Sequence, residues 1–218
     1  MNVMTNEGLR PQILAIAGGS CSGKTSLSRI VHERVGKNAS ALLQLDRYYR
    51  NIPLQNGTQM DLPNFDHPDA LDLAFFGRHL AALKRGEAID VPIYNYALHR
   101  RQDETELMPP KPLIVVEGHL VLHDPNLRAL FDLSCYIECP EDIRLERRIA
   151  RDGAQRGRNE ASVRQQFAQT VGPMHEQFVR PSKVHADRVV SQDEYCVRTV
   201  ALVDSIIEQL EASAALGA

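Results

Sequence analysis

The stretch GGSCSGKT, Gly18 to Thr25, decides the fold. It matches the pattern G-x-x-x-x-G-K-[ST], in which glycines let a loop turn its backbone N–H groups toward phosphate oxygens. The loop follows the apolar run QILAIA and precedes a segment, 24–35, whose apolar residues recur at helical spacing. A strand, a glycine-rich loop and a helix in this order predict a nucleotide-phosphate site at the amino end of the helix.

Individual residues of the loop would have different roles at such a site. Lys24 would neutralise charge between the β- and γ-phosphates, and the hydroxyl of Thr25 would bind Mg²⁺. Glu117 ends a buried apolar run and would hold a water bound to the same ion. ATP is the expected donor and GTP the alternative, although the chain contains no Asn-Lys pair of the kind that switch GTPases use to read guanine. The predicted phosphate-site residues of the loop are Gly18, Gly19, Ser20, Cys21, Ser22, Gly23, Lys24, Thr25 and Ser26.

The remaining pattern predicts a single α/β domain over residues 1–218, with a mostly parallel sheet covered by helices on both faces. A chain of 218 residues is the right size for one such domain. Apolar runs that predict strands cover 12–20, 41–46, 111–122, 133–139 and 187–191, and 89–96 with 103–108 predict a small hairpin. Predicted helices cover 24–35, 69–86 with an N-cap at Asp69, 140–152, 160–179 with a bend near Pro173, and 194–212.

The composition excludes several classes of protein. The formal net charge of −3 argues against a protein that binds nucleic acid through bulk charge. No apolar run is long enough for a membrane span, and the first residues do not show the charged and apolar regions of a secretory signal. The four cysteines are too sparse for a disulfide scaffold. We therefore expect a cytoplasmic protein with no nucleic-acid or membrane partner.

Two carboxylates are candidates for the acceptor site. Ligands of open parallel sheets bind beyond the carboxyl ends of the strands, and the predicted strand 41–46 ends in Asp46. Asp46 could accept the proton of an attacking hydroxyl, or it could be a turn or N-cap residue. Asp66 lies in the long segment 46–68, where it could hold a vicinal diol or serve the turn before Pro68. For His119 we favour a strand-end role over a catalytic one.

Seven segments, in order from Gln12 to about Val190, resemble the uridine kinase (uridine–cytidine kinase) family, relatives of phosphoribulokinase. They are GGSCSGKTS, LDRYYRN, NFDHPDALD, IYNYALHRR, IVVEGHLVL, RLERRIARD with RGR, and RPSKVHAD. The resemblance implies a P-loop kinase that uses ATP and Mg²⁺ to phosphorylate the 5′-hydroxyl of a pyrimidine ribonucleoside. It further implies a base-binding hairpin at about 87–110, an arginine-rich lid at about 148–160, and a homotetramer.

The resemblance also assigns roles to individual residues. Asp46 matches the general base, which acts with Lys24 and Arg151 in the transfer, and Asp66 matches the residue that holds the ribose hydroxyls. The matched nucleoside-pocket positions are Tyr49, Phe65, Tyr94, Tyr96, His99, Arg148 and Gln166. Arg151, Arg156 and Arg158 match the lid that closes on the ATP phosphates.

Chemistry supports such a lid independently, because arginines can stabilise charge on a transferring phosphoryl group, and Gly153 and Gly157 could supply a hinge. Asn95 and Tyr96 depart from the Asp and Phe that are usual in the family, so the preferred base stays open. Two other functions stay open as well. One is a sugar-phosphate or other small-metabolite kinase of the same superfamily, and the other is a nucleotide-binding regulator without catalysis.

Overall fold

The computed structural model describes residues 10–51, 64–96 and 98–216. Within these residues, five parallel strands form a central sheet in the order β2-β5-β1-β6-β7. The strands are β1 (Gln12–Gly18), β2 (Ser40–Gln44), β5 (Leu113–Glu117), β6 (Leu133–Ile137) and β7 (Arg188–Val190). The predicted parallel sheet is confirmed, and β5 ends at Glu117 rather than continuing through the apolar residues that follow.

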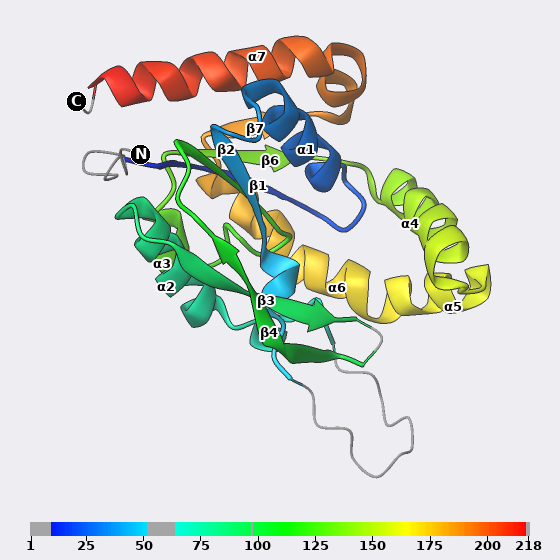
Figure 1. The fold of residues 1–218 in the computed structure, drawn as a ribbon. Helices are drawn as coiled ribbons and strands as arrows, with labels where there is room; N and C mark the ends of the chain where they lie inside the picture. The colour runs from blue at the N-terminus through cyan, green and yellow to red at the C-terminus, as the bar shows by residue number, and fades with distance from the viewer. Residues whose placement is uncertain (1–9, 52–63, 97, 217–218) are drawn as a thin grey trace.

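Two helices cover one face of the sheet, α1 (Lys24–Val35) and α7 (Gln192–Leu216) (Figure 1). Their buried residues, among them Leu27, Val31 and Ile206, pack against strand residues such as Ile16 and Val115. The amphipathic period of 24–35 therefore corresponds to a helix with one buried face. The last helix begins two residues earlier than predicted and is kinked at Arg198.

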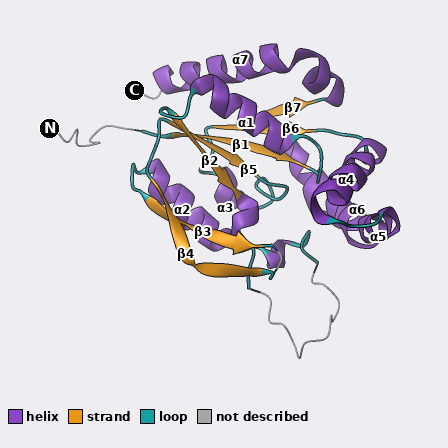
Figure 2. Ribbon diagram, turned by 45° about the vertical axis from the view of Figure 1, so that its right-hand side comes forward, coloured by secondary structure: helices purple, strands orange, loops and turns teal. Residues whose placement is uncertain are grey.

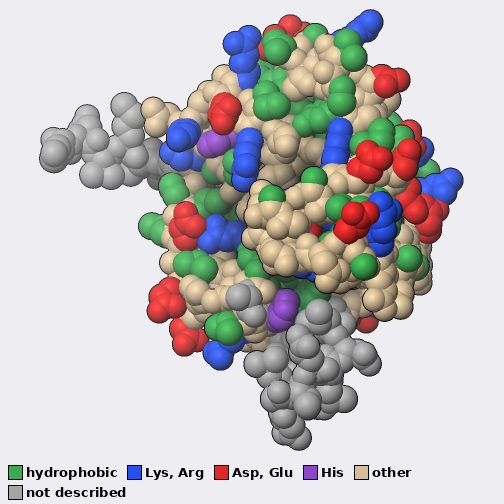
Figure 3. Space-filling model, turned by 90° about the vertical axis from the view of Figure 1, so that its right-hand side faces the viewer, with side chains coloured by type: hydrophobic (Ala, Val, Ile, Leu, Met, Phe, Trp, Pro, Cys, Tyr) green, Lys and Arg blue, Asp and Glu red, His purple; other side chains and the backbone are tan. Residues whose placement is uncertain are grey.

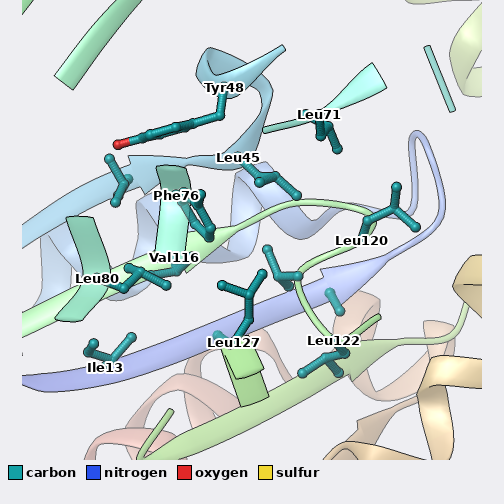
Figure 4. Close-up of a cluster of buried hydrophobic side chains, with 14 of the residues drawn as sticks. Ile13, Leu45, Tyr48, Leu71, Phe76, Leu80, Val116, Leu120, Leu122 and Leu127 are labelled. Atoms are coloured by element: carbon teal, nitrogen blue, oxygen red, sulfur yellow. The ribbon is translucent and has the colours of Figure 1, made fainter. Parts of the chain in front are cut away.

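The opposite face is covered by α2 (Leu73–Lys84) and the short α3 (Pro125–Arg128). Figure 4 shows the cluster beneath them, in which Phe76 and Leu80 of α2 meet Ile13 and Val116 of the sheet. The predicted start of this helix at Asp69 is wrong. Residues Pro68–Ala70 form a separate 3₁₀ turn, and α2 begins after Asp72, whose carboxylate accepts the Phe75 N–H at 3.1 Å.

The predicted hairpin is present as β3 (Ile89–Asn95) and β4 (Arg100–Met108), an antiparallel pair that lies apart from the central sheet (Figure 2). β4 begins earlier than the predicted 103. Arg101 holds the hairpin to the body of the protein, because its guanidinium donates to the Tyr48 carbonyl at 2.8 Å and lies 3.5 Å from Asp72. This places the hairpin beside the chain that follows β2.

Helices α4 (Glu141–Arg156), α5 (Glu160–Gln166) and α6 (Gly172–Met174) form an arm at the carboxyl-end side of the sheet (Figure 1). The predicted bend of 160–179 takes the form of two π-helical turns, Phe167–Val171 and His175–Val179, on either side of Pro173. Gly153 lies inside α4, which ends at Arg156 and is capped by Gly157. Of the two glycines expected to form a hinge, only Gly157 therefore interrupts the helix.

Candidate active site

The phosphate-binding loop joins β1 to α1 at the carboxyl edge of the sheet (Figure 1). Gly23 has φ +108°, a conformation that side chains rarely adopt, and a Cβ there would lie 2.9 Å from the Tyr195 ring. The loop thus needs glycine both for its turn and for the approach of α7. Lys24 folds back along the loop, and its Nζ donates to the Gly19 carbonyl at 3.3 Å. Cys21 is half-buried with φ +62°, and Ser22 is buried beneath the loop.

Thr25 and Glu117 meet beneath the phosphate loop. The Thr25 hydroxyl donates to Glu117 Oε1 at 3.0 Å, and Gln44 Nε2 donates to the same oxygen at 3.0 Å. A hydroxyl and a carboxylate are hard oxygen donors that suit Mg²⁺, which is commonly held by one or two such groups together with phosphates and water. The two residues therefore fit the predicted metal role. Across the described ranges, no cluster of three or more His, Cys, Asp or Glu residues could hold a metal ion by itself.

Asp46 lies in the 3₁₀ turn Leu45–Tyr48, directly beyond the end of β2. Its side chain is 48% exposed, but one carboxylate oxygen, Oδ1, is buried and has no hydrogen-bond partner among the described residues. That oxygen lies 3.8 Å from Nδ1 of His119. The turn thus presents a carboxylate to the crevice at the strand ends, as the sequence predicts.

His119 lies within electrostatic range of charged residues from four separate motifs. Its side chain is only 8% exposed, and burial lowers the pKa of the imidazole. The charges of Asp66, Asp46 and Glu117 oppose that shift and the charge of Lys24 reinforces it, so all four lie within electrostatic range of this ring. The base candidate, the diol candidate, the metal-associated carboxylate and the P-loop lysine therefore all influence one buried ring.

The aromatic side chains predicted for the nucleoside pocket come from three segments and pack against one another. The Tyr49 ring meets Phe65 and Tyr94 at centroid distances of 5.5 Å each. His99 lies 4.8 Å from Phe65 at an interplanar angle of 31°, and Tyr96 lies 5.2 Å from Tyr94. These are ordinary aromatic pair distances. All five predicted pocket aromatics are thus brought together, although they come from the turn after β2, the segment before α2, and the hairpin.

Burial and nearby carboxylates shift the pKa values of two tyrosines in this cluster. Burial raises the pKa of Tyr49 well above its usual range, and the carboxylates of Asp46 and Asp66 add to the rise. Tyr96 is 52% exposed, yet desolvation of its hydroxyl and then the charge of Asp46 raise its pKa too. Both phenols therefore stay protonated at neutral pH and can donate hydrogen bonds beside the two carboxylates.

Arg148 links the lid to the phosphate loop. It is 7% exposed, and its guanidinium donates to the Ser20 hydroxyl at 2.9 Å and to Gln166 Oε1 at 3.2 Å. Burial lowers its pKa, while the charge of Asp66 is the largest influence in the other direction. The predicted pocket residues Arg148 and Gln166 are therefore adjacent to each other and within range of the diol candidate.

Asp152 lies at the centre of the arginine-rich segment that is predicted to form the lid. Its carboxylate is fully buried, 2.8 Å from Arg151 and 3.6 Å from each of Arg148, Arg156 and Arg158. Asp152 is not among the site residues that the sequence predicts. Its position four residues after Arg148 and four before Arg156 is a helical charge spacing that could have identified it.

Arg144 and His175 were also missed. Both are buried, at 2% and 9% exposure, and an added Cβ on Gly19 would lie 2.8 Å from Arg144 Nη1 and 2.9 Å from His175 Nδ1. Burial, followed by the charge of Arg144, lowers the pKa of His175 to about 4. This pair supports the underside of the phosphate loop. No local sequence signal marks His175, since its contact depends on the path of the π-helical segment.

Basic and acidic side chains are interspersed over the side of the molecule that carries the lid (Figure 3). This mixed surface agrees with the small net charge of −3. Within the described residues, no helix is both long and apolar enough to cross a membrane.

The fold and the site together define a P-loop phosphotransferase. A family model described as "Phosphoribulokinase / Uridine kinase family" matches residues 13–198. The chain belongs to this family.

Curated relatives are similar over most of the chain. A uridine kinase of Chloroflexus aggregans is 40% identical over 206 residues, which cover 93% of this chain and 96% of the relative. A uridine kinase of Geobacillus kaustophilus is 39% identical, with 93% and 98% covered. A uridine kinase of Shewanella baltica strain OS155 is 44% identical, with 82% and 86% covered.

Solved structures confirm the architecture. A putative fructose transport system kinase from Silicibacter superposes with a TM-score of 0.67 at 21% identity, covering 87% of this chain and 92% of that one. Phosphoribulokinase from Rhodobacter spheroides superposes with a TM-score of 0.61 at 13% identity, covering 84% and 71%. At these identities the likeness supports the fold alone, which is the parallel P-loop kinase sheet that the sequence predicts.

Proposed function

We propose that this protein is a uridine/cytidine kinase that transfers the γ-phosphoryl group of ATP to the 5′-hydroxyl of the nucleoside in pyrimidine salvage. The observation that carries the proposal is the arrangement of side chains beyond the strand ends, where Glu117 accepts from Thr25 at 3.0 Å and Asp46 Oδ1 lies 3.8 Å from His119 Nδ1. Asp66 and Lys24 lie within electrostatic range of the same imidazole. A phosphate-binding lysine, a metal-associated carboxylate and two acceptor-site carboxylates are the groups that phosphoryl transfer to a diol-bearing alcohol requires. The names of the relatives agree with this assignment.

In the proposed reaction, Asp66 accepts hydrogen bonds from the two ribose hydroxyls and fixes the sugar. Asp46 accepts the proton of the 5′-hydroxyl as its oxygen attacks the γ-phosphorus. Lys24 and the lid arginines Arg151, Arg156 and Arg158 balance charge on the transferring group. Mg²⁺, associated with Thr25 and Glu117, supplies further charge neutralisation when it is bound.

The aromatic wall supports a nucleoside acceptor over a sugar phosphate. Phe65 is half-buried and packs against Tyr49, which is itself buried beside Tyr94. Phe65 can offer apolar ring surface to a planar base, and the half-buried His99 can offer a ring nitrogen to its edge. A sugar-phosphate acceptor would instead need cationic side chains at that end of the crevice. The proposal includes a cytoplasmic location, a homo-oligomeric assembly and ATP rather than GTP as donor.

The test is a substrate panel with purified protein and MgATP or MgGTP. We expect ADP release with uridine and cytidine and much less with ribulose 5-phosphate, nicotinamide riboside or pantothenate. Asp46→Asn should lower kcat by at least about 100-fold while ATP binding measured by calorimetry is retained, and Asp69→Asn, an exposed carboxylate nearby, should behave as wild type. The proposal fails if neither pyrimidine nucleoside stimulates ADP release.

A further inference from the structure

His119 is buried at the acceptor site without the hydrogen bonds that a buried imidazole normally makes. Its residue exposure is 6%, and Nε2 is buried with no partner in the described part of the chain. Its Nδ1 lies 3.8 Å from Asp46 Oδ1, which is likewise buried and unpartnered. A buried carboxylate oxygen without a partner is costly, and here a ring nitrogen stands opposite it at slightly more than a hydrogen-bond length, so a small movement would join the two.

The surrounding core holds these two side chains opposite each other. Leu45 precedes Asp46 and Leu120 follows His119, and both leucines lie in the hydrophobic cluster of Figure 4. Gly118 permits the close approach, because a Cβ at that position would lie 2.5 Å from the Leu45 Cβ. The backbones of the two segments are therefore fixed by packing, and only side-chain rotation separates the pair from a hydrogen bond.

We propose that His119 is a positioning residue for the catalytic carboxylate: its Nδ1–H donates to Asp46 Oδ1 and leaves Oδ2 to receive the proton of the acceptor hydroxyl. The inference rests on the proposed function of the site. A donor at Nδ1 exists in the imidazolium and in one neutral tautomer, so the role does not depend on the charge of the ring. Catalytic hydrogen bonds are often long in the free enzyme and shorten in the complex with substrate.

Three substitutions of His119 distinguish the role of Nδ1 from that of Nε2. The amide nitrogen of Asn occupies the position of Nδ1, that of Gln the position of Nε2, and Leu removes both with similar volume. We expect His119→Leu and His119→Gln to lower kcat about 10-fold, with the KM for ATP unchanged, and His119→Asn to stay within about threefold of wild type. Urea unfolding of each variant gives the folded fraction, and if the Leu variant does not fold, the Asn and Gln variants decide the question.

A double-variant cycle with Asp46→Asn supplies a readout that a structural role would not affect. If His119 acts through Asp46, adding His119→Leu to Asp46→Asn should lower kcat by less than twofold further, whereas independent roles would multiply the two losses. Unchanged kcat in His119→Leu, multiplicative losses, or rescue by Gln in place of Asn would overturn the inference. If the wild-type enzyme is active, each of these outcomes contradicts only the role of His119 and leaves the proposed function unaffected. If the wild type is inactive in the substrate panel, both the proposed function and the role of His119 are contradicted.

Discussion

The hydroxyl of Thr25 donates a hydrogen bond to Glu117 across 3.0 Å, joining the first turn of α1 to the last residue of β5. The two residues are 92 positions apart in the sequence. They meet because β1 and β5 are neighbouring parallel strands, in which Ile16 is paired with Glu117. The contact places a carboxylate where the metal of a phosphate loop is expected.

Glu117→Gln should therefore lower the apparent affinity of the enzyme for Mg²⁺. The amide keeps an oxygen that can accept from Thr25, but the negative charge is lost. We expect the Mg²⁺ concentration for half-maximal activity to rise at least about 10-fold, with little change in the KM for nucleoside. Magnesium titrations of the kinase reaction measure this, and Glu208→Gln on the exposed face of α7 is the matched control. An unaltered magnesium dependence would remove Glu117 from the metal site.

His99→Ala tests the base-reading role of the hairpin. His99 lies on Phe65, so the substitution removes a stacked ring and a hydrogen-bonding group from the acceptor wall without touching the phosphate loop. The KM for uridine should rise about 10-fold or more, while the KM for ATP stays within twofold. Gln102→Ala, an exposed position on β4, should change neither constant. Equal effects on the two substrates would show that the hairpin does not read the base.

Asp152→Asn should destabilise the lid. The substitution removes the negative charge that balances four neighbouring arginines, one of them buried, and leaves those cations to repel one another. The loss of one partner from such a buried network costs about 3 kcal/mol of unfolding free energy. Urea denaturation measures the loss, and Glu146→Gln on the exposed side of α4 should stay within about 0.5 kcal/mol of wild type. A similar small change for Asp152→Asn would mean that solvent, rather than this carboxylate, balances the arginines.

His175 should make the protein less stable in mild acid. Its pKa is about 4 in the folded protein because of burial and the nearby charge of Arg144, with Glu176 acting in the opposite direction. In the unfolded chain the pKa is about 6.5, so between these values the unfolded state binds more protons, and stability falls as pH decreases. From pH 7 to pH 5 this histidine alone should cost about 2 kcal/mol.

His175→Gln isolates that contribution, since the other titrating groups are common to both proteins. Its unfolding free energy should fall by about 2 kcal/mol less than that of wild type over the same pH interval. Identical pH dependences would place the folded-state pKa of His175 near its ordinary value.

Much of the site could be predicted from the sequence because phosphate binding is a local property. Lys24 and Thr25 follow the loop glycines directly, and Asp46 and Glu117 are visible as charged residues that interrupt apolar runs. The residue at which α2 begins could not be predicted from such a local pattern. Asp69 and Asp72 are both plausible caps, and the 3₁₀ turn at Pro68–Ala70 decided between them.

By itself the sequence determined the P-loop, the parallel α/β architecture and the family, because glycine spacing and apolar periodicity are encoded within short segments. Only the tertiary structure decided which charges share an environment. Asp152 lies within 3.6 Å of four arginines of the predicted lid, and Asp46 Oδ1 lies 3.8 Å from the buried ring of His119. The physical reason is that burial and charge pairing depend on which strands are neighbours, and β5 lies between β1 and β2 although it comes after both in the chain.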